Sequence, residues 1–141
     1  MAFRARIRVR FGDIDYAGIV YYPRFLHYFH VALEEFFEAE VGINYPEILN
    51  RHRLGFPTVH LETNFRRSLR YGDLIDVEIR VLEIGRTSIT WGYKGYNEKD
   101  LAVEGQNVTV SMNMDTFEKT ETPAWLIKGL ETYRQRCREE A

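Results

Sequence analysis

Residues Pro23 to Val41 read PRFLHYFHVALEEFFEAEV, and this stretch decides the fold. With a helical rotation of about 100° per residue, apolar side chains cover half of its circumference and leave a narrow polar stripe. The apolar set is Phe25, Tyr28, Phe29, Ala32, Leu33, Phe36, Phe37 and Ala39, and the polar stripe is Arg24, His27, His30, Glu34, Glu35 and Glu38. The opening proline favours a helix start and Gly42 favours its end. A helix this apolar must be surrounded by other elements.

The segment before this helix has the alternation of a β-strand. From Phe3 to Phe11, apolar residues alternate with four arginines at positions 4, 6, 8 and 10. Alternation with period two predicts a half-buried strand. A row of charges on one face of a strand is typical of a solvated surface or a protected sheet edge, and we expect that role for the arginines.

Four further strands are predicted after a short helical connection from Tyr45 to Arg53. Their predicted ranges are Thr58 to Phe65, Leu74 to Ile84, Thr87 to Tyr96 and Leu101 to Met114. The first two alternate as one-sided strands. In the last, the apolar phase switches from Leu101 and Val103 to Val108, Val110, Met112 and Met114, which predicts a bulge near Gly105. A helix rich in charge follows Pro123, from Ala124 to about Glu140.

Composition places the chain among ordinary globular proteins. Its 141 residues fit one domain, residues 1–141, and the net charge of −2 argues against nucleic acid as a partner. No run of about 18 apolar residues is present, so no membrane span is expected. Cys137 is the single cysteine, which excludes an intramolecular disulfide and favours a reducing, cytoplasmic location. The order of elements predicts an α+β fold, with a curved antiparallel sheet around the central helix.

A carboxylate precedes the helix in a glycine-containing turn. Residues Phe11 to Phe29 read FGDIDYAGIVYYPRFLHYF. Asp15 is a candidate base or nucleophile, and the unpaired N–H groups at the helix start are candidate donors to an oxyanion. On spacing alone, an Asx-turn or a capping role explains Asp15 somewhat better. Asp13 is expected to order the turn by accepting backbone hydrogen bonds.

This stretch closely resembles the signature of the 4-hydroxybenzoyl-CoA thioesterase family of hotdog-fold proteins. The resemblance implies a single hotdog domain that hydrolyses an acyl-CoA thioester. Coenzyme A is then part of the substrate and no separate cofactor is expected, although an acyl carrier protein is an alternative carrier. The family also implies a homodimer or homotetramer with active sites at the subunit interface.

The resemblance assigns roles to individual residues. It implies that Asp15 acts as nucleophile or general base, and that the backbone N–H of Tyr22 polarises the carbonyl. Gly18 is expected to let the chain approach the substrate closely. The substrate pocket is expected to include Tyr16, Tyr21, Phe25 and His60, although a surface or hydrogen-bonded histidine explains His60 better. So many aromatic side chains are compatible with an aromatic acyl group as well as with a core.

The turn Arg86, Thr87 and Ser88 resembles the turn that meets the phosphates of coenzyme A in this family. Guanidinium groups bind phosphate in a bidentate manner, and hydroxyl groups add hydrogen bonds. A simple hairpin connection explains the same residues, and both interpretations stay open.

Other classes of function fit this sequence less well than thioester hydrolysis. His27, His30 and Glu34 have the spacing of metal ligands, but a polar stripe explains them better and no metal is expected. Hydratases and dehydratases of the same fold carry an Asp-x-x-x-x-His pattern. It is absent here, because Gly18 lies five residues after Asp13 and Val20 five after Asp15. A binding protein for acyl thioesters without turnover remains an alternative.

Overall fold

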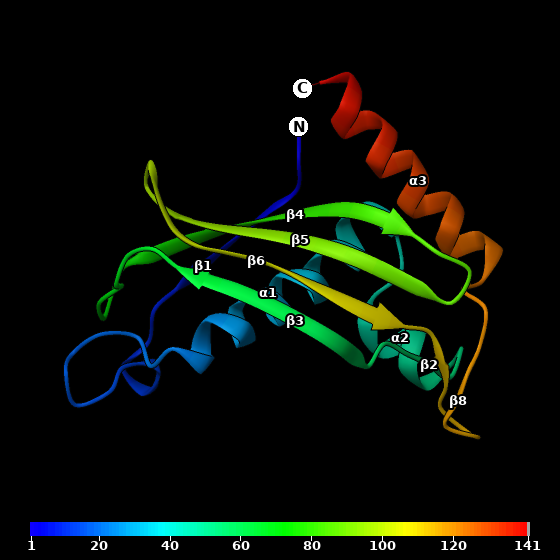
Figure 1. Ribbon diagram of the computed structural model, residues 1–141, viewed down its shortest axis with the longest axis horizontal. Helices are drawn as coiled ribbons and strands as arrows, with labels where there is room; N and C mark the ends of the chain where they lie inside the picture. The colour runs from blue at the N-terminus through cyan, green and yellow to red at the C-terminus, as the bar shows by residue number, and fades with distance from the viewer. Residues whose placement is uncertain (141) are drawn as a thin grey trace.

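A computed structural model describes residues 1–140 and shows an α+β hotdog fold (Figure 1). A five-stranded antiparallel sheet, in the order β1-β4-β5-β6-β3, lies across the long helix α1. The principal elements are β1 (Arg4–Arg8), α1 (Pro23–Phe36), α2 (Tyr45–Asn50), β3 (Thr58–Phe65), β4 (Leu74–Ile84), β5 (Ser88–Asn97), β6 (Asp100–Val110) and α3 (Ala124–Glu139). The short elements are the turn η1 (Phe11–Asp13), the π-helical turn η2 (Phe37–Val41) and the strands β2 (Leu54–Gly55), β7 (Met112–Asn113) and β8 (Glu118–Lys119).

The central helix begins and ends where the sequence predicts. Pro23 is its first residue, and Gly42 ends η2 with a left-handed φ of 84°. Every apolar residue predicted to be buried is buried except Ala39, which is exposed. A π-helical turn holds more residues than an α-helical turn, so side chains after Phe37 rotate away from the predicted face.

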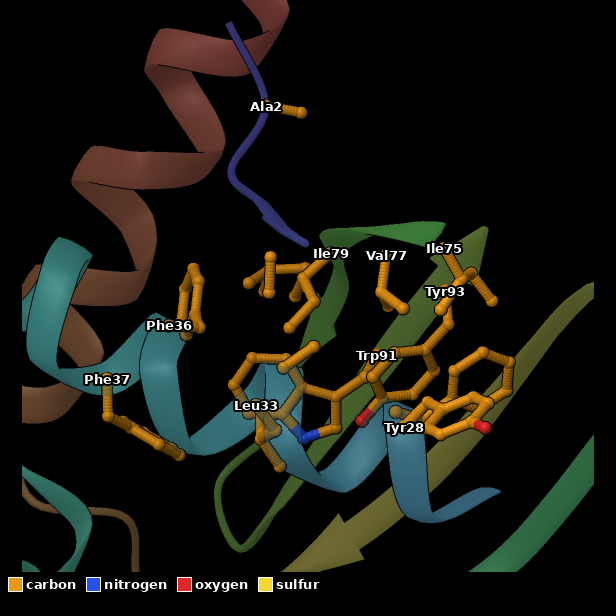
Figure 2. Packing of buried hydrophobic residues seen from close by; sticks show 14 of the residues in the cluster. Ala2, Tyr28, Leu33, Phe36, Phe37, Ile75, Val77, Ile79, Trp91 and Tyr93 are labelled. Carbon is orange, nitrogen blue, oxygen red and sulfur yellow. The ribbon is translucent and has the colours of Figure 1, made fainter. Parts of the chain in front are cut away.

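The core forms where α1 packs against the middle of the sheet (Figure 2). The ring of Phe29 stacks on Tyr93 of β5 with centroids 4.6 Å apart. The ring of Phe36 meets Trp91 edge-on at 5.6 Å. Strand β4 adds the inward residues Ile75, Val77, Ile79 and Val81, as the alternation predicted. Buried aromatic contacts of this kind fix the helix on the sheet.

Strand β1 forms one edge of the sheet, and its arginines protect it. Arg4 and Arg6 each donate two hydrogen bonds to carboxylates of β4, those of Glu78 and Asp76. The strand ends at Arg8, so the prediction that it extends to Phe11 was wrong. Residues 11–13 form the turn η1, and the ring of Phe11 is 74% exposed.

Strand β3 forms the other edge of the sheet, and the apolar residues that were predicted to be buried on it are exposed. It pairs only with β6, and Val59, Leu61 and Phe65 are 61%, 43% and 47% exposed. The expectation of one buried face was therefore wrong for the single chain. An edge strand has one neighbour instead of two, and α1 covers its inner face only in part.

Strand β6 has no switch of phase near Gly105. Asn107 pairs with inward-facing Trp91 and Thr109 pairs with Ile89, and both polar residues are buried. Val108 and Val110 therefore face outward, opposite to the prediction. The irregularity in the β5–β6 ladder lies at Ala102, because Gly95 pairs with Val103 and Tyr96 with Leu101. Sequence alternation failed here because the inward face of β6 is partly polar.

Helix α3 covers the edge of β4 that lies beyond Arg4, the first residue of β1. The Tyr133 hydroxyl accepts from the Phe3 N–H and donates to the Ile79 carbonyl. A buried stripe of Leu126, Leu130, Tyr133 and Cys137 runs along this charge-rich helix, so one of its faces is apolar. Among residues 1–140, no helix combines the length and the apolar character that a membrane crossing requires.

Candidate active site

The segment between η1 and α1 folds back on itself as a small hairpin. Ile14 and Val20 form an antiparallel bridge, and the Asp15 N–H donates to the Ile19 carbonyl at 2.9 Å. Gly18 adopts a left-handed φ of 81°, which an L side chain disfavours, and so closes the turn. The Val20 N–H donates to the Leu69 carbonyl, which anchors the loop just before β4 begins.

Asp15 lies at the exposed tip of this hairpin. Its Oδ1 accepts the Ala17 N–H at 2.8 Å, which is the Asx-turn that the spacing allowed. Within residues 1–140, its Oδ2 has no hydrogen-bond partner, so one carboxylate oxygen is ordered and the other is available. The turn fixes the orientation of the carboxylate and leaves Oδ2 free to bind another group.

Tyr22 lies at the entrance of α1 with its backbone N–H unpaired. Tyr21 donates its N–H to the Asp13 carbonyl, whereas the Tyr22 N–H has no acceptor in the described part of the chain. Unpaired N–H groups at a helix start attract negative charge. An unpaired backbone donor is therefore present at this end of the helix.

Aromatic rings surround the start of the helix. The Tyr22 ring lies 5.4 Å from Tyr21 and 6.1 Å from Phe65 of β3, and Phe65 lies 5.6 Å from Phe25. Tyr16, at the hairpin tip, makes no part of this cluster and is fully exposed. Of the three aromatic residues predicted to line the pocket, Tyr21 and Phe25 thus belong to this cluster within one chain, and Tyr16 does not.

Asp13 has the structural role that the sequence predicts. Its Oδ2 accepts the Arg10 N–H at 2.9 Å and the Tyr28 hydroxyl at 2.8 Å. Burial, with the hydrogen bond to Asp13 second, raises the pKa of Tyr28 above its ordinary value, so the phenol stays protonated. Asp13 thereby ties η1 to α1.

We expect Asp13→Ala to lower the free energy of unfolding by about 2 kcal/mol, because it leaves the partly buried Tyr28 hydroxyl without an acceptor. Urea unfolding followed by circular dichroism measures this change. Asp13→Asn, which keeps an acceptor oxygen, is the matched control and is expected to lose less than half as much. Equal losses for both variants would contradict the role of the hydrogen bond.

His60 lies apart from the other predicted site residues. It pairs with outward-facing Val108, and its Nε2 lies 3.0 Å from Glu62 Oε1. The hydrogen bond from His60 lowers the pKa of Glu62 below its ordinary value. The single chain places His60 on the face of the sheet away from α1.

The turn of Arg86, Thr87 and Ser88 joins β4 to β5 at the opposite end of the sheet from Asp15. Since β4 has 11 residues, its two ends lie about 35 Å apart. Arg86 donates to Glu121 at 3.1 Å and is otherwise exposed. One chain therefore does not bring this turn to its own Asp15.

Sequence reasoning missed a cavity between α1 and the strands β3, β5 and β6. Its volume is about 160 Å³, and its lining includes Leu26, Phe29 and His30 of α1 together with Tyr93, Asn107 and Thr109 of the sheet. The wrong phase assigned to β6 placed Asn107 and Thr109 on the outer face. Their pairing opposite Trp91 and Ile89 shows that they face inward, and the sequence pattern of β6 carries no signal of it.

The metal-like spacing on α1 produces no ligand set. His30 Nε2 lies 3.2 Å from Glu34 Oε2. No group of three potential ligands occurs within residues 1–140. His30 and Glu34 are therefore neighbouring, partly exposed side chains on the polar stripe.

Comparisons with known proteins agree in fold and in class. A family model described as the thioesterase-like superfamily matches residues 9–130. A 1,4-dihydroxy-2-naphthoyl-CoA hydrolase from Nostoc punctiforme is 29% identical over 135 residues, which cover 96% of this chain and 90% of the relative. An enzyme of the same name from Synechococcus elongatus is 27% identical over 116 residues, covering 82% of this chain and 85% of its own.

Solved structures extend the agreement. The crystal structure of a 1,4-dihydroxy-2-naphthoyl-CoA thioesterase from Synechocystis superposes with a TM-score of 0.82 at 21% identity, covering 92% of this chain and 96% of the other. At that identity the likeness establishes the fold alone. The five-stranded sheet wrapped around α1 is thus the hotdog fold that the sequence predicted.

Proposed function

This chain belongs to the thioesterase-like superfamily and is a thioester hydrolase, and we propose on that premise that it converts an aromatic acyl-CoA to the free acid and coenzyme A. One observation carries the proposal. A free Asp15 oxygen and an unpaired Tyr22 N–H lie on the same short segment, which consists of the hairpin and the helix start that follows it. The names of the relatives and the aromatic cluster around Tyr22 support an aromatic acyl group. The narrower membership of the 4-hydroxybenzoyl-CoA thioesterase family remains a prediction.

The proposed chemistry uses one carboxylate and one backbone donor. The thioester oxygen accepts the Tyr22 N–H, which stabilises the negative charge that develops on it. Asp15 either removes a proton from a water molecule that attacks the carbonyl carbon, or attacks that carbon itself, displaces the thiolate and forms an anhydride that water then hydrolyses. The carbon–sulfur bond breaks and coenzyme A leaves as a thiolate. A thiol with a pKa of about 8.5 leaves without a general acid, so no cofactor is required.

We propose that a second copy of the chain completes the site by pairing along β3. This edge strand is eight residues long, has no Pro and exposes three large apolar side chains. Long apolar edges of this kind are pairing surfaces. Antiparallel pairing of two β3 strands around a two-fold axis joins the two sheets and reverses one against the other.

The reversal brings opposite ends of the two sheets together. The end that carries Asp15 in one chain then lies beside the end that carries the β4–β5 turn in the other. Arg86 of the partner subunit is therefore the better candidate for the coenzyme A phosphates than Arg86 of the same chain. This arrangement supports a homodimer. A homotetramer would then consist of two such dimers.

We expect Val59→Lys to convert the assembly to monomers and to lower kcat/KM at least tenfold. Both chains carry the substitution, so a two-fold interface contains two new positive charges, and lysines on an edge strand oppose strand pairing. Light scattering after size exclusion measures the mass, with 16.7 kDa for one chain. Val59→Thr, which keeps a β-branched side chain without charge, is the control. A monomeric wild type with full activity would contradict the shared site.

The function itself is tested by thiol release from a panel of benzoyl-, phenylacetyl-, short-chain and long-chain acyl-CoA thioesters. Release of coenzyme A from the aromatic members supports the proposal. Binding without release would favour an acyl-thioester binding protein. Preference for the same acyl groups on an acyl carrier protein would change the carrier and leave the reaction as proposed.

A further inference from the structure

We propose that Tyr28 is a positioning residue of the candidate active site, and that it acts through Asp13 to hold the Asp15 carboxylate in place relative to the Tyr22 N–H. This inference rests on the proposed thioesterase function, and it adds a residue that touches neither the thioester nor the attacking water. The sequence assigned Tyr28 only to the buried face of the central helix, and the structure shows that its hydroxyl also binds Asp13.

The hairpin that carries Asp15 needs an anchor on its first arm. Asp15 lies on that arm, and Tyr22 lies where the second arm enters α1. The second arm is also held by the bond from the Val20 N–H to the Leu69 carbonyl. Among residues 1–140, the Asp15 carboxylate is bonded only to the Ala17 N–H of the same hairpin. The position of Asp15 relative to Tyr22 therefore depends on how the first arm is fixed to the helix.

Asp13, two residues before Asp15, is the point at which the first arm meets the helix. Its carbonyl accepts the Tyr21 N–H at 2.9 Å, and its Oδ2 accepts the Tyr28 hydroxyl at 2.8 Å. Tyr28 is 2% exposed, and its ring packs edge-on against Phe25 with centroids 6.0 Å apart, so the core fixes the direction of the hydroxyl. The Tyr28 hydroxyl therefore joins the first arm to the helix whose start carries the unpaired donor.

The bond from Tyr28 is of a strong kind, because its acceptor is a carboxylate. Hydrogen bonds to ionised groups are roughly twice as strong as neutral ones. The same carboxylate accepts the Arg10 N–H at 2.9 Å, and its Oδ1 lies 3.9 Å from Arg24 Nε. Burial, followed by the hydrogen bond to Asp13, raises the pKa of Tyr28 above its ordinary value. A phenol that keeps its proton throughout the neutral range positions Asp13 and transfers no proton itself.

Tyr28→Phe tests the proposal, because it removes the donor and keeps the ring that packs in the core. We expect kcat to fall about tenfold or more, since a small misplacement of a reacting group costs up to about 10²-fold. KM is expected to stay within about twofold of wild type, because Tyr28 has no contact with the substrate. The measurement is thiol release from the acyl-CoA thioester that wild type hydrolyses fastest. A rise in KM with kcat unchanged would overturn the proposal.

Tyr133→Phe is the matched control, because it loses an equally buried hydrogen bond. Tyr133 is also 2% exposed, and its hydroxyl donates to the Ile79 carbonyl. Its ring meets Phe36, which lies 14 residues after Tyr22 and therefore about 21 Å further along α1. Figure 2 shows Phe36 and Tyr28 at opposite ends of the packed cluster. We expect the control to melt at a lower temperature and to keep its kcat within about twofold of wild type. Equal losses of kcat in the two variants would be a general effect of lost stability and would overturn the proposal.

Two variants of Asp13 test whether Tyr28 acts through it. Asp13→Asn keeps an acceptor oxygen and is expected to retain kcat within about threefold of wild type, whereas Asp13→Ala is expected to lose at least as much as Tyr28→Phe. The double variant with Asp13→Ala and Tyr28→Phe is expected to lose no more than Asp13→Ala alone, because residues that act as one unit are not additive. All variants are assayed at a temperature at which circular dichroism shows them folded. Losses that multiply in the double variant would mean that Tyr28 acts independently of Asp13, against the proposal.

Hydrogen exchange followed by mass spectrometry separates failure of this inference from failure of the proposed function. It reports on the hydrogen-bonded amides of residues 15–21 without any substrate. Tyr28→Phe is expected to speed exchange there about tenfold, and Tyr133→Phe is expected to leave it unchanged. If wild type hydrolyses no thioester but this difference is found, the proposed function fails and the anchoring of the hairpin by Tyr28 stands. If wild type hydrolyses thioesters and neither exchange nor kcat responds to Tyr28→Phe, the inference is overturned and the proposed function stands.

Discussion

Asp15→Asn is expected to lower kcat by about 10³-fold and to leave the free energy of unfolding within about 0.5 kcal/mol of the wild-type value. The kinetic loss follows from the proposed chemistry, because an amide neither accepts a proton from water nor attacks a thioester. Stability is preserved because the asparagine oxygen still accepts the Ala17 N–H that Asp15 Oδ1 accepts. Both side chains favour Asx-turns.

The measurement combines thiol release with urea unfolding on the same preparations. Asp73→Asn is the matched control, because Asp73 also orders a turn, with its Oδ2 accepting the Arg70 N–H at 2.9 Å. We expect that control to keep kcat within about twofold of wild type, since Asp73 has no proposed contact with the substrate. Undiminished hydrolysis by folded Asp15→Asn would remove the carboxylate from the mechanism and leave only the fold and family.

Phe36→Ala is expected to cost about 4 kcal/mol of the free energy of unfolding, the largest effect on stability that we predict for one side chain. The Phe36 ring is fully buried and contacts four aromatic rings, those of Phe3, Phe37, Trp91 and Tyr133. Its removal opens a cavity where α1, the sheet and α3 meet. The free energy of unfolding of a natural domain is only about 5–15 kcal/mol in total, so the variant is expected to be close to unfolding at 37 °C.

Urea unfolding followed by near-ultraviolet circular dichroism measures this loss, because the signal reports aromatic packing. Phe11→Ala is the control. The Phe11 ring is 74% exposed and meets only Tyr71, at 5.9 Å, so its removal is expected to cost less than about 1 kcal/mol. Similar losses for the two variants would show that Phe36 does not anchor the core.

Much of the fold follows from local pattern. The helix from Pro23, its end at Gly42 and the alternation of β4 were all correct, because each depends on residues within one or two turns or on one strand. The error at Phe11 arose because the chain turns into η1, and the error at Ala39 arose because a π-helical turn rotates the side chains that follow Phe37. In β6, the inward positions are polar because they line a cavity instead of dry core, so hydrophobicity pointed to the wrong face.

The candidate site was predictable to a different degree. The sequence located the Asp15 hairpin and the Tyr22 helix start, and the structure places both at one end of the sheet, where an open Oδ2 and an unpaired N–H remain. Their catalytic roles remain predictions. Asn107 lies far from both in sequence, and only the pairing of β6 with β3 and β5 brings it under α1.

The sequence alone therefore determined the central helix, the strands and the position of the reactive hairpin, because periodicity, proline and glycine act over short distances along the chain. The tertiary structure decided which faces are buried, that β3 is an exposed edge, and that Asn107 lines a cavity under α1. Those features depend on contacts between residues far apart in the chain, and the burial of a side chain is set by its neighbours in space.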